Sequence, residues 1–320
     1  MASVTQHMSS PSGVEAAVRR TGAVSTPRFN QNPTSIPALL VAREATLVPD
    51  PFLIAGIVNL TPDSFSDGGS YAEAEQAIAH ALRLEAEGAR ILDLGAESTR
   101  PGADAVGSEE EQRRLMPALQ ALVALREQGK SHAVLAVDTF RAATAARALE
   151  AGAEMINDIS GGVFEPAILS IAAEYRAGYV LGHCPARPKV MREHPRADDI
   201  VENLLRHFEA QMSALLRAGL PEECICLDPC IGFGKDLADT AQIFQNISRL
   251  HELGRPLYFG LSRKSFLGTA AGAAVHERDA LSAVAVALCA ADGVTVHRVH
   301  DVSGAAQALA LVRALYHPTA

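Results

Sequence analysis

The chain has 320 residues, of which 48% are hydrophobic and 20% are charged, and its formal net charge at pH 7 is -9. This length allows one large domain or two smaller ones. The negative charge argues against a nucleic-acid partner and against an anionic membrane surface, because both select for basic patches. No apolar run approaches the roughly 20 residues that a membrane-spanning helix requires.

The start of the chain and its cysteines indicate its organisation and compartment. Residues 1–38 are rich in Ser, Thr, Pro, Gln and Asn, without a hydrophobic period, and are predicted to be a disordered extension. They also lack the layout of a signal peptide. Residues 39–320 carry a nearly continuous apolar pattern and are expected to form one catalytic domain. The cysteines are 5 in number, which suits a reducing cytoplasm better than a disulfide framework.

Short apolar segments alternate with longer amphipathic ones along the domain, in the way that parallel sheets require. Strands are predicted at 52–60, 89–97, 133–139, 154–160, 178–184, 224–230, 256–262 and 293–301, with helical patterns at 74–88, 109–129 and 200–219 among the connections. This repeat predicts an α/β fold, a (β/α)8 TIM barrel. The alternative is an open doubly wound sheet, but the G-x-G-x-x-G turn usual after its first strand is missing.

Polar residues stand at the carboxyl end of every predicted strand, where barrel enzymes carry their catalytic groups. Residues two apart on a strand share a face, so Arg298 and His300 both point above the barrel interior as a cationic pair. Any one of these groups alone could be a helix cap or a surface side chain. Their convergence indicates a functional site. The residues are Asn59, Glu97, Thr99, Arg100, Asp138, Asn157, His183, Cys184, Asp228, Lys264, Arg298 and His300.

Three other patterns are weaker. The cysteines of the 224–230 strand fit no standard ligand spacing and are interpreted as small packing residues. His297 and His300 lie three apart and face opposite sides of a strand, which disfavours a shared metal. GFGK at 232–235 resembles a phosphate loop but lacks the full G-x-x-x-x-G-K-[ST] pattern.

The polar groups at the strand ends indicate the ligand. Asp138, Asp228 and Asn157 offer acceptors suited to the donor edge of a flat heterocycle, and Lys264 offers donors to its carbonyl or ring nitrogen. The pair at the end of the eighth strand is suited to phosphate, which barrels often hold after their seventh and eighth strands. A nitrogen-rich ring joined to a phosphate group is therefore expected.

Seven motifs carry a specific resemblance: GIVNLTPDSFSDGGSY, AESTRPGA, VDT, INDISGG, DPCIGFGK, GLSRKSFLG and HRVHDV. Over nearly all of residues 39–315 the chain resembles the dihydropteroate synthase family, a family of pterin-binding barrels. The resemblance implies a transferase of folate biosynthesis and a target of sulfonamides. It would condense 6-hydroxymethyl-7,8-dihydropterin pyrophosphate with p-aminobenzoate, giving 7,8-dihydropteroate and pyrophosphate. A cytoplasmic homodimer that uses Mg²⁺ is implied as well.

The resemblance also implies residue roles. Asp138, Lys264 and Asp67 are expected to serve the reaction, and Asn59 to hold the metal with the pyrophosphate. Cys184 and Cys230 depart from the family, which usually has a methionine and a glycine at these positions. The expected substrate contacts are Asn157, Asp228, Asp138, Lys264, Thr99, Arg100, Pro101, Phe65, Phe233, Cys184, Gly260, Ser265, Arg298 and His300.

The glycine-hinged loop at 61–69 is interpreted as a lid. Cleavage of a bond to pyrophosphate generates a cation that water would quench, so the site has to be covered during the reaction. Phe65 would form a wall of the arylamine pocket, and Asp63 or Asp67 would reach the metal or the cation. An aniline nitrogen is a nucleophile without deprotonation, so no strong general base is expected.

Two alternatives use the same fold or ligand. One is a barrel that transfers a methyl group from methyltetrahydrofolate to a corrinoid, and the other is a protein that binds pterin without turnover. Neither needs both the phosphate pair, Arg298 and His300, and the lid. The sequence therefore favours the synthase.

Overall fold

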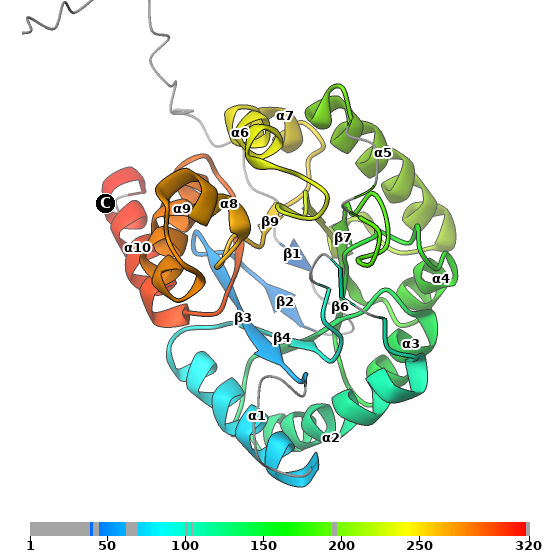
Figure 1. Cartoon of the computed structure of the whole chain (residues 1–320). Helices are drawn as coiled ribbons and strands as arrows, with labels where there is room; N and C mark the ends of the chain where they lie inside the picture. Colours follow the sequence, from blue (N-terminus) through cyan, green and yellow to red (C-terminus); the bar gives the residue numbers. More distant parts are fainter. Residues whose placement is uncertain are drawn as a thin grey trace, which may run out of the picture. The chain divides into compact units, whose positions relative to one another are not determined.

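The structure, a computed structural model, describes residues 39–40, 45–61, 70–99, 102–103, 105–191, 193 and 197–317, with the backbone alone at 39–40 and 70–73 (Figure 1). These residues belong to one compact unit that spans 32–320. The predicted extension at 1–38 lies outside the described residues and stays a prediction.

A sheet of 8 parallel strands occupies the centre of this unit, and its spatial order is β8-β7-β6-β5-β4-β3-β10-β9. A bridge between Leu227 and Leu257 joins the two outermost strands, so the sheet closes on itself. The predicted (β/α)8 barrel is confirmed. Its strands are β3 (Leu53–Asn59), β4 (Ile91–Gly95), β5 (Val134–Asp138), β6 (Met155–Asp158), β7 (Gly178–Gly182), β8 (Ile225–Asp228), β9 (Tyr258–Phe259) and β10 (Val296–Val299).

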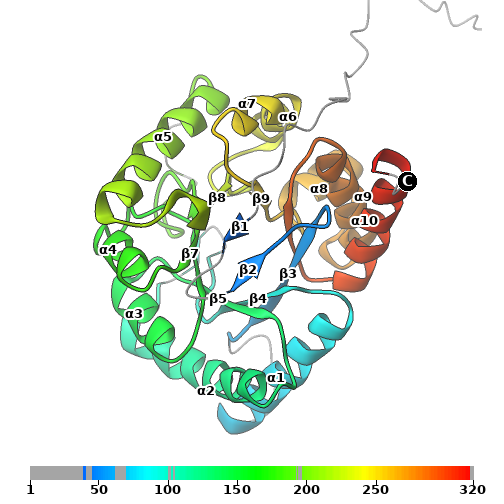
Figure 2. The same cartoon turned by 180° about the vertical axis from the view of Figure 1, so that it is seen from behind.

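The helices surround the barrel as an outer ring (Figure 1, Figure 2). The three helical patterns of the sequence coincide with α1, α2 and α5, to within a few residues at each end. Among the described residues, none of the helices is long and apolar enough to cross a membrane. The helices are α1 (Ser70–Ala86), α2 (Ser108–Glu127), α3 (Ala142–Glu150), α4 (Ala167–Glu174), α5 (Ile200–Ala218), α6 (Leu237–Gln245), α7 (Ile247–His251), α8 (Ser265–Ala271), α9 (Arg278–Ala291) and α10 (Val302–Tyr316), with short 3₁₀ turns η2 (Glu222–Cys224) and η3 (Val275–Glu277).

One element was not predicted. A short antiparallel pair, β1 (Leu39–Leu40) and β2 (Thr46–Leu47), precedes the barrel. β1 lies beside η2, which leads into β8, so the pair lies at the amino end of the barrel, opposite the predicted site. Two residues give too short an alternation for a sequence pattern to detect, and β9, which also has two residues, is predicted only through the longer apolar segment around it.

The barrel strands are buried on both faces: their inner positions face the barrel interior and their outer positions face the helices. Apolar and small side chains such as Val134, Ala136 and Val296 fill the inner positions below the polar strand ends. Cys224, Cys226 and Cys230 are buried free thiols, which confirms their predicted packing role. The polar side chains are thus concentrated at one end of an otherwise apolar interior.

Asp158 organises the outer face of β6. It is fully buried, and its Oδ2 accepts hydrogen bonds from the Tyr179 hydroxyl and the Gly162 amide, both at 2.6 Å. Its Oδ1 accepts bonds from the Ser160 amide and hydroxyl, both at 2.8 Å. Gly161 and Gly162 follow with φ of 61° and 85°, the left-handed region that favours glycine. A carboxylate with this many donors stabilises the tight turn after β6.

We expect Tyr179→Phe to lower the free energy of unfolding by about 1–3 kcal/mol, because it removes a donor from a buried carboxylate. Urea denaturation followed by circular dichroism measures this change. Tyr175→Phe is the matched control, since its hydroxyl makes a longer bond of 3.3 Å to Glu150 near the surface. A loss no larger than that of the control would show that Asp158 does not depend on this hydroxyl.

Candidate active site

Asp93, in the middle of β4, joins the polar groups at the carboxyl end of the barrel. It is fully buried, and its Oδ2 accepts hydrogen bonds from the Arg298 Nε and, at 2.9 Å, from the Asn157 amide. Arg298 also donates from Nη2 to the Asp138 Oδ2 at 2.8 Å. These side chains come from β4, β5, β6 and β10, so they meet in the barrel interior.

Asp93 was not among the predicted site residues. The signal in the sequence was a carboxylate at the centre of the apolar segment ILDLG, two residues after Ile91 and on the same strand face. A charge at such a position is rare unless it is paired. The partner, Arg298, lies 205 residues away in the sequence, which is why the pair could not be identified there.

Asp93 and Asp138 share one guanidinium group. Burial raises the pKa of Asp138 to about 7, an effect that Arg298 opposes and the Asp93 carboxylate reinforces. Burial disfavours the charge on Arg298, but the two carboxylates outweigh it and raise its pKa above the usual value. Arg298 is therefore cationic at every accessible pH, while Asp138 titrates near neutrality.

Asp228 and Lys264 complete the ring of polar groups. Asp228 is buried at the end of β8, and its Oδ1 accepts a hydrogen bond from the Cys230 amide at 2.7 Å. Burial raises the pKa of Asp228. Burial and the nearby Arg298 lower the pKa of Lys264 to about 8. The Lys264 Nζ lies 4.0 Å from the ring centroid of Phe233, a cation–π distance, so the aromatic ring fixes the ammonium over the site.

The end of β10 carries the predicted phosphate pair, but only one member is cationic. Burial and Arg298 lower the pKa of His300 to about 3, so its imidazole is neutral at pH 7. The Ser262 hydroxyl accepts from the His300 amide at 3.2 Å and lies 2.9 Å from its Nδ1. Ser262 can then donate to Nδ1, which leaves the ring proton on Nε2. The prediction of two charges is corrected to one charge and one neutral donor.

Further predicted site residues lie within the described chain. Gly260 passes directly beside Arg298, where an added Cβ would lie 3.8 Å from the Arg298 Cδ. Asn59 is the last residue of β3, and Thr99 follows β4. Ser265 is exposed at the start of α8. Phe65, Asp67, Arg100 and Pro101, together with the loop at 62–69, lie outside the described residues, so their predicted roles stay predictions.

Cys184 lies just after β7 in a small apolar cluster with Cys230, Phe140, Ile159 and Met191. Burial raises the pKa of the Cys184 thiol to about 11, so it stays protonated and acts as an apolar surface. Cys230 has a φ of 49°, the left-handed conformation in which a glycine would be unstrained. The turn after β8 is therefore built with a cysteine where the backbone favours glycine.

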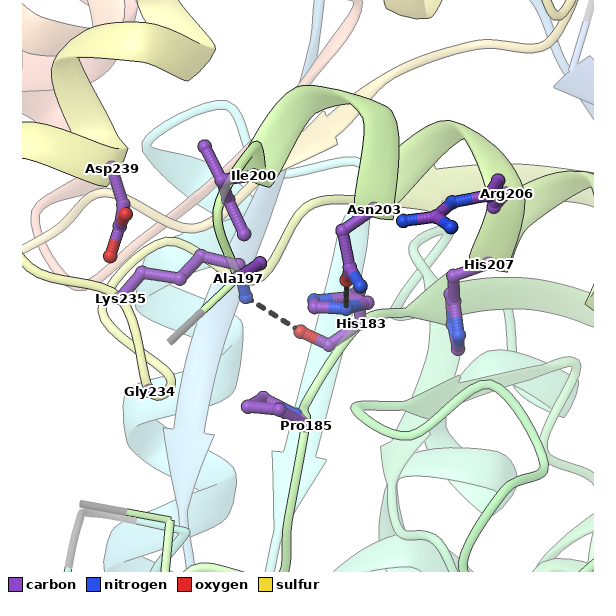
Figure 3. Close-up of a pocket in the computed structure, with 10 residues that line it drawn as sticks. All are labelled: His183, Pro185, Ala197, Ile200, Asn203, Arg206, His207, Gly234, Lys235 and Asp239. Atoms are coloured by element: carbon purple, nitrogen blue, oxygen red, sulfur yellow. Dashed lines mark hydrogen bonds between the residues drawn. The ribbon is translucent and has the colours of Figure 1, made fainter. Parts of the chain in front are cut away.

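Lys235, the last residue of GFGK, is not a phosphate ligand. Its Nζ donates to the carbonyl oxygens of His183 at 2.8 Å, Phe233 at 3.1 Å and Cys230 at 3.3 Å. An ammonium group has three donors, and all of them are used. Lys235 instead borders a cavity of about 590 Å³ between α5 and the β8–α6 connection (Figure 3). None of the residues that line this cavity belongs to the cluster around Asp93.

Glu97, one of the polar strand-end residues, turns away from this cluster. It forms an ion pair with Arg141 at 2.5 Å, and Arg141 also contacts Glu111 of α2 at 3.3 Å. This network connects the end of β4 to the start of α3.

Comparison with known proteins gives the family. The model of the family described as "Pterin binding enzyme" matches residues 55–300. Dihydropteroate synthase from a Synechocystis species is 38% identical over 264 residues, which cover 82% of this chain and 90% of the relative.

Solved structures agree with this match. Dihydropteroate synthase from Xanthomonas albilineans, with 4-aminobenzoic acid, superposes with a TM-score of 0.80 at 40% identity and covers 88% of this chain and 99% of that one. The Yersinia pestis enzyme in a sulfonamide complex superposes with a TM-score of 0.79 at 37% identity, covering 86% and 98%. The chain belongs to the pterin-binding enzyme family, and within it to the dihydropteroate synthases.

Proposed function

We propose that this protein condenses 6-hydroxymethyl-7,8-dihydropterin pyrophosphate with p-aminobenzoate, giving 7,8-dihydropteroate and pyrophosphate. The observation that carries the proposal is the cluster in which Asp93 holds both Arg298 and Asn157 beside Asp138. The same cluster offers acceptors for a nitrogen-rich ring and a fixed cation for a diphosphate. The structure of the Xanthomonas albilineans enzyme in complex with 7,8-dihydropteroate superposes on this chain with a TM-score of 0.77.

Ring recognition follows from the orientation of Asn157. Because its Nδ2 donates to Asp93, its Oδ1 is left to accept an N–H of the ligand. The carboxylates of Asp138 and Asp228 supply further acceptors for the amino group and the ring N–H groups. Lys264 supplies donors to the ring carbonyl or to a ring nitrogen. A flat heterocycle with donors on one edge and acceptors on the other satisfies these groups.

Arg298 and His300 are suited to the diphosphate. The contacts to Asp93 and Asp138 use two of the five guanidinium N–H groups, which leaves three for phosphate oxygens. His300 adds a neutral N–H donor. Donors that are already oriented stabilise the negative charge that builds on the leaving group as its bond breaks.

In the proposed chemical step the C–O bond breaks with its electron pair going to pyrophosphate, which leaves a cation at the methylene carbon of the pterin. The amine lone pair of p-aminobenzoate then forms the new C–N bond at this carbon. The amine then loses a proton to solvent or to the departing pyrophosphate. An arylamine attacks without prior deprotonation, which fits a site whose described residues bind and orient the ligand.

We also propose that the diphosphate is bound as a magnesium complex. Asn59, at the end of β3, supplies an amide oxygen, the hard ligand type that Mg²⁺ prefers, and fits this role. Among the described residues no cluster of three or more His, Cys, Asp and Glu could hold a metal, so substrate phosphates and water would provide most ligands. When bound, the ion neutralises charge on the leaving group.

The p-aminobenzoate is proposed to lie next to Lys264 and Ser265, at the start of α8. The remaining walls would come from Thr99, Phe65 and Pro101. This placement rests on motif positions and on the location of α8 beside the cluster.

The protein is further proposed to work as a cytoplasmic homodimer. The five cysteines are free, which suits a reducing compartment. The packed helices α9 and α10 leave apolar side chains exposed, among them Val284 and Leu288 on α9, each 56% exposed. Two such residues four apart form a stripe on one helix face, which a second copy could cover.

The function is tested by pyrophosphate release from 6-hydroxymethyl-7,8-dihydropterin pyrophosphate with and without p-aminobenzoate. We expect release that depends on p-aminobenzoate and on Mg²⁺, with dihydropteroate identified by mass spectrometry. Pterin binding without release would favour a non-catalytic pterin protein. Methyl transfer from methyltetrahydrofolate to a corrinoid would favour the other alternative.

Arg298→Lys should separate phosphate binding from folding. Lysine keeps the charge next to Asp93 and Asp138 but cannot reproduce the planar set of donors, so pyrophosphate affinity should fall by about 1.5–3 kcal/mol. Calorimetric titration with pyrophosphate and Mg²⁺ measures the change. Arg298→Ala is the comparison, and it should destabilise the fold by about 3–5 kcal/mol because it leaves two buried carboxylates unpaired. Unaltered pyrophosphate affinity in a folded Arg298→Lys enzyme would contradict the assignment.

The pH dependence of kcat/KM for the pterin substrate should be bell-shaped. Below about pH 7 Asp138 gains a proton and loses an acceptor, and above about pH 8 Lys264 loses its charge. Maximal kcat/KM is therefore expected between these values. Lys264→Arg should move only the alkaline limb to higher pH, since arginine stays protonated. If the alkaline limb is the same in both enzymes, Lys264 is not the group that titrates.

Leu288→Glu should weaken the proposed dimer, because it places a charge in the apolar stripe of α9. Sedimentation velocity should show a larger monomer fraction for this variant than for the wild type. Leu237→Glu is the control, since Leu237 is an exposed leucine on α6, outside the stripe. Equal monomer fractions for the three proteins would place the interface elsewhere.

A further inference from the structure

Lys235 is a buried cation whose partners are backbone carbonyls. Only 7% of the residue is exposed, and its ammonium donates to His183, Cys230 and Phe233 as described above. Burial lowers the pKa of Lys235, which means that its charge is held at a free-energy cost. The three acceptors belong to two connections that are distant in sequence. His183 follows β7, whereas the other two residues follow β8.

Both connections form walls of the pterin site. The residue after His183 is Cys184, whose side chain lies in the apolar cluster with Cys230. On the other side, the Cys230 amide donates to Asp228, one of the ring acceptors. Each carbonyl that Lys235 holds is thus within one residue of a side chain or amide that shapes the ring pocket.

Phe233 extends this chain of contacts to the reacting end. Its carbonyl accepts from Lys235, and its ring lies under the Lys264 ammonium. A shift of the backbone at Phe233 would therefore move the aromatic face that positions Lys264. One buried ammonium thus connects, through these backbone carbonyls, side chains of the pocket that it does not itself touch.

We propose that Lys235 is a positioning residue for the pterin ring: its ammonium joins the ends of β7 and β8 and so sets the spacing of Cys184, Asp228 and Phe233. The inference rests on the proposed function, because it concerns the same site. Lys235 does not touch the substrate. It acts through the backbone that carries the contact residues.

The neighbouring cavity makes this role testable. Figure 3 shows Lys235 at the edge of the cavity, bonded to the His183 carbonyl, with Asn203 bonded to the His183 ring at 2.7 Å. If the lysine side chain is shortened, water can enter from the cavity and solvate the three carbonyl oxygens. Truncated variants are therefore expected to fold, but with the two connections no longer joined.

The first test compares Lys235→Met with the wild type in steady-state kinetics. We expect KM for the pterin substrate to rise by about tenfold, the scale of a lost charge-assisted contact, while KM for p-aminobenzoate changes by less than about twofold. Lys235→Arg, which keeps the charge and several donors, should recover most of the loss. The affinity for a pterin analogue, measured by calorimetry, should be highest in the wild type, lower in Lys235→Arg and lowest in Lys235→Met.

Arg126→Met is the matched control. Arg126 also donates to a backbone carbonyl, that of Gly152 at 2.9 Å, and pairs with Glu154. It lies in the last turn of α2, and its partners Gly152 and Glu154 lie just before β6, at the opposite end of the barrel. This variant should lower thermal stability without raising KM for the pterin substrate, which separates a general loss of stability from a loss of positioning.

The second test is chemical rescue. Lys235→Ala leaves a space that opens to the cavity, and n-propylammonium matches the missing end of the side chain. Millimolar n-propylammonium should restore pterin affinity in Lys235→Ala and should not affect Lys235→Met, where the space is filled. Tetramethylammonium controls for ionic strength, because it carries the charge but has no N–H donor.

The outcomes separate this inference from the proposed function. A wild-type enzyme that makes dihydropteroate, with Lys235→Met and Arg126→Met giving the same pterin KM, would overturn the positioning role and leave the function intact. Equal loss of affinity for pterin and p-aminobenzoate would also overturn it. A wild-type enzyme that neither binds pterin nor releases pyrophosphate would remove the proposed function itself.

Discussion

The contact between Asp93 and Arg298 is the interaction on which the site depends. A fully buried carboxylate is stable only if it is paired, and here one oxygen serves both the guanidinium and the Asn157 amide. That single acceptor sets which way Asn157 faces and where Arg298 lies. Since Arg298 also serves Asp138, the ring acceptors and the phosphate donor are oriented together. In the proposed function, recognition of the ring and of the diphosphate therefore depends on one buried carboxylate.

The strand alternation gives neighbouring residues different tasks. Asn157 faces the barrel interior and the proposed ligand, whereas Asp158 faces the helices and holds the turn after β6 through Tyr179 and Gly162. Both residues are buried. Asp158 accepts hydrogen bonds from protein groups, whereas Asn157 donates to Asp93 and keeps its Oδ1 for the proposed ligand. One short segment therefore carries a residue of the proposed binding site next to a residue that stabilises the fold, and substitutions at the two positions should have different effects.

Burial also explains the ionisation of the site. The low polarity of the barrel interior raises the pKa of Asp138 and lowers that of Lys264, so that both titrate near neutral pH. The same effect keeps His300 neutral and the Cys184 thiol protonated. Arg298 is the exception, because two carboxylates hold its charge. The Lys235 ammonium donates to three backbone carbonyl groups. It thereby joins the connections that follow β7 and β8, without contacting the proposed ligand.

The sequence by itself determined the barrel, through eight apolar segments spaced by amphipathic helices, and it located the polar groups, because parallel strands all end at the same edge. It also identified the family, through long motifs at those strand ends. Only the tertiary structure decided which groups pair. Asp93 had no visible partner in its own segment, Lys235 stood only in a weak phosphate-loop pattern, and His300 was interpreted as a cation. Each depends on contacts between residues far apart in the chain and on the exclusion of water around them, which a local pattern does not encode.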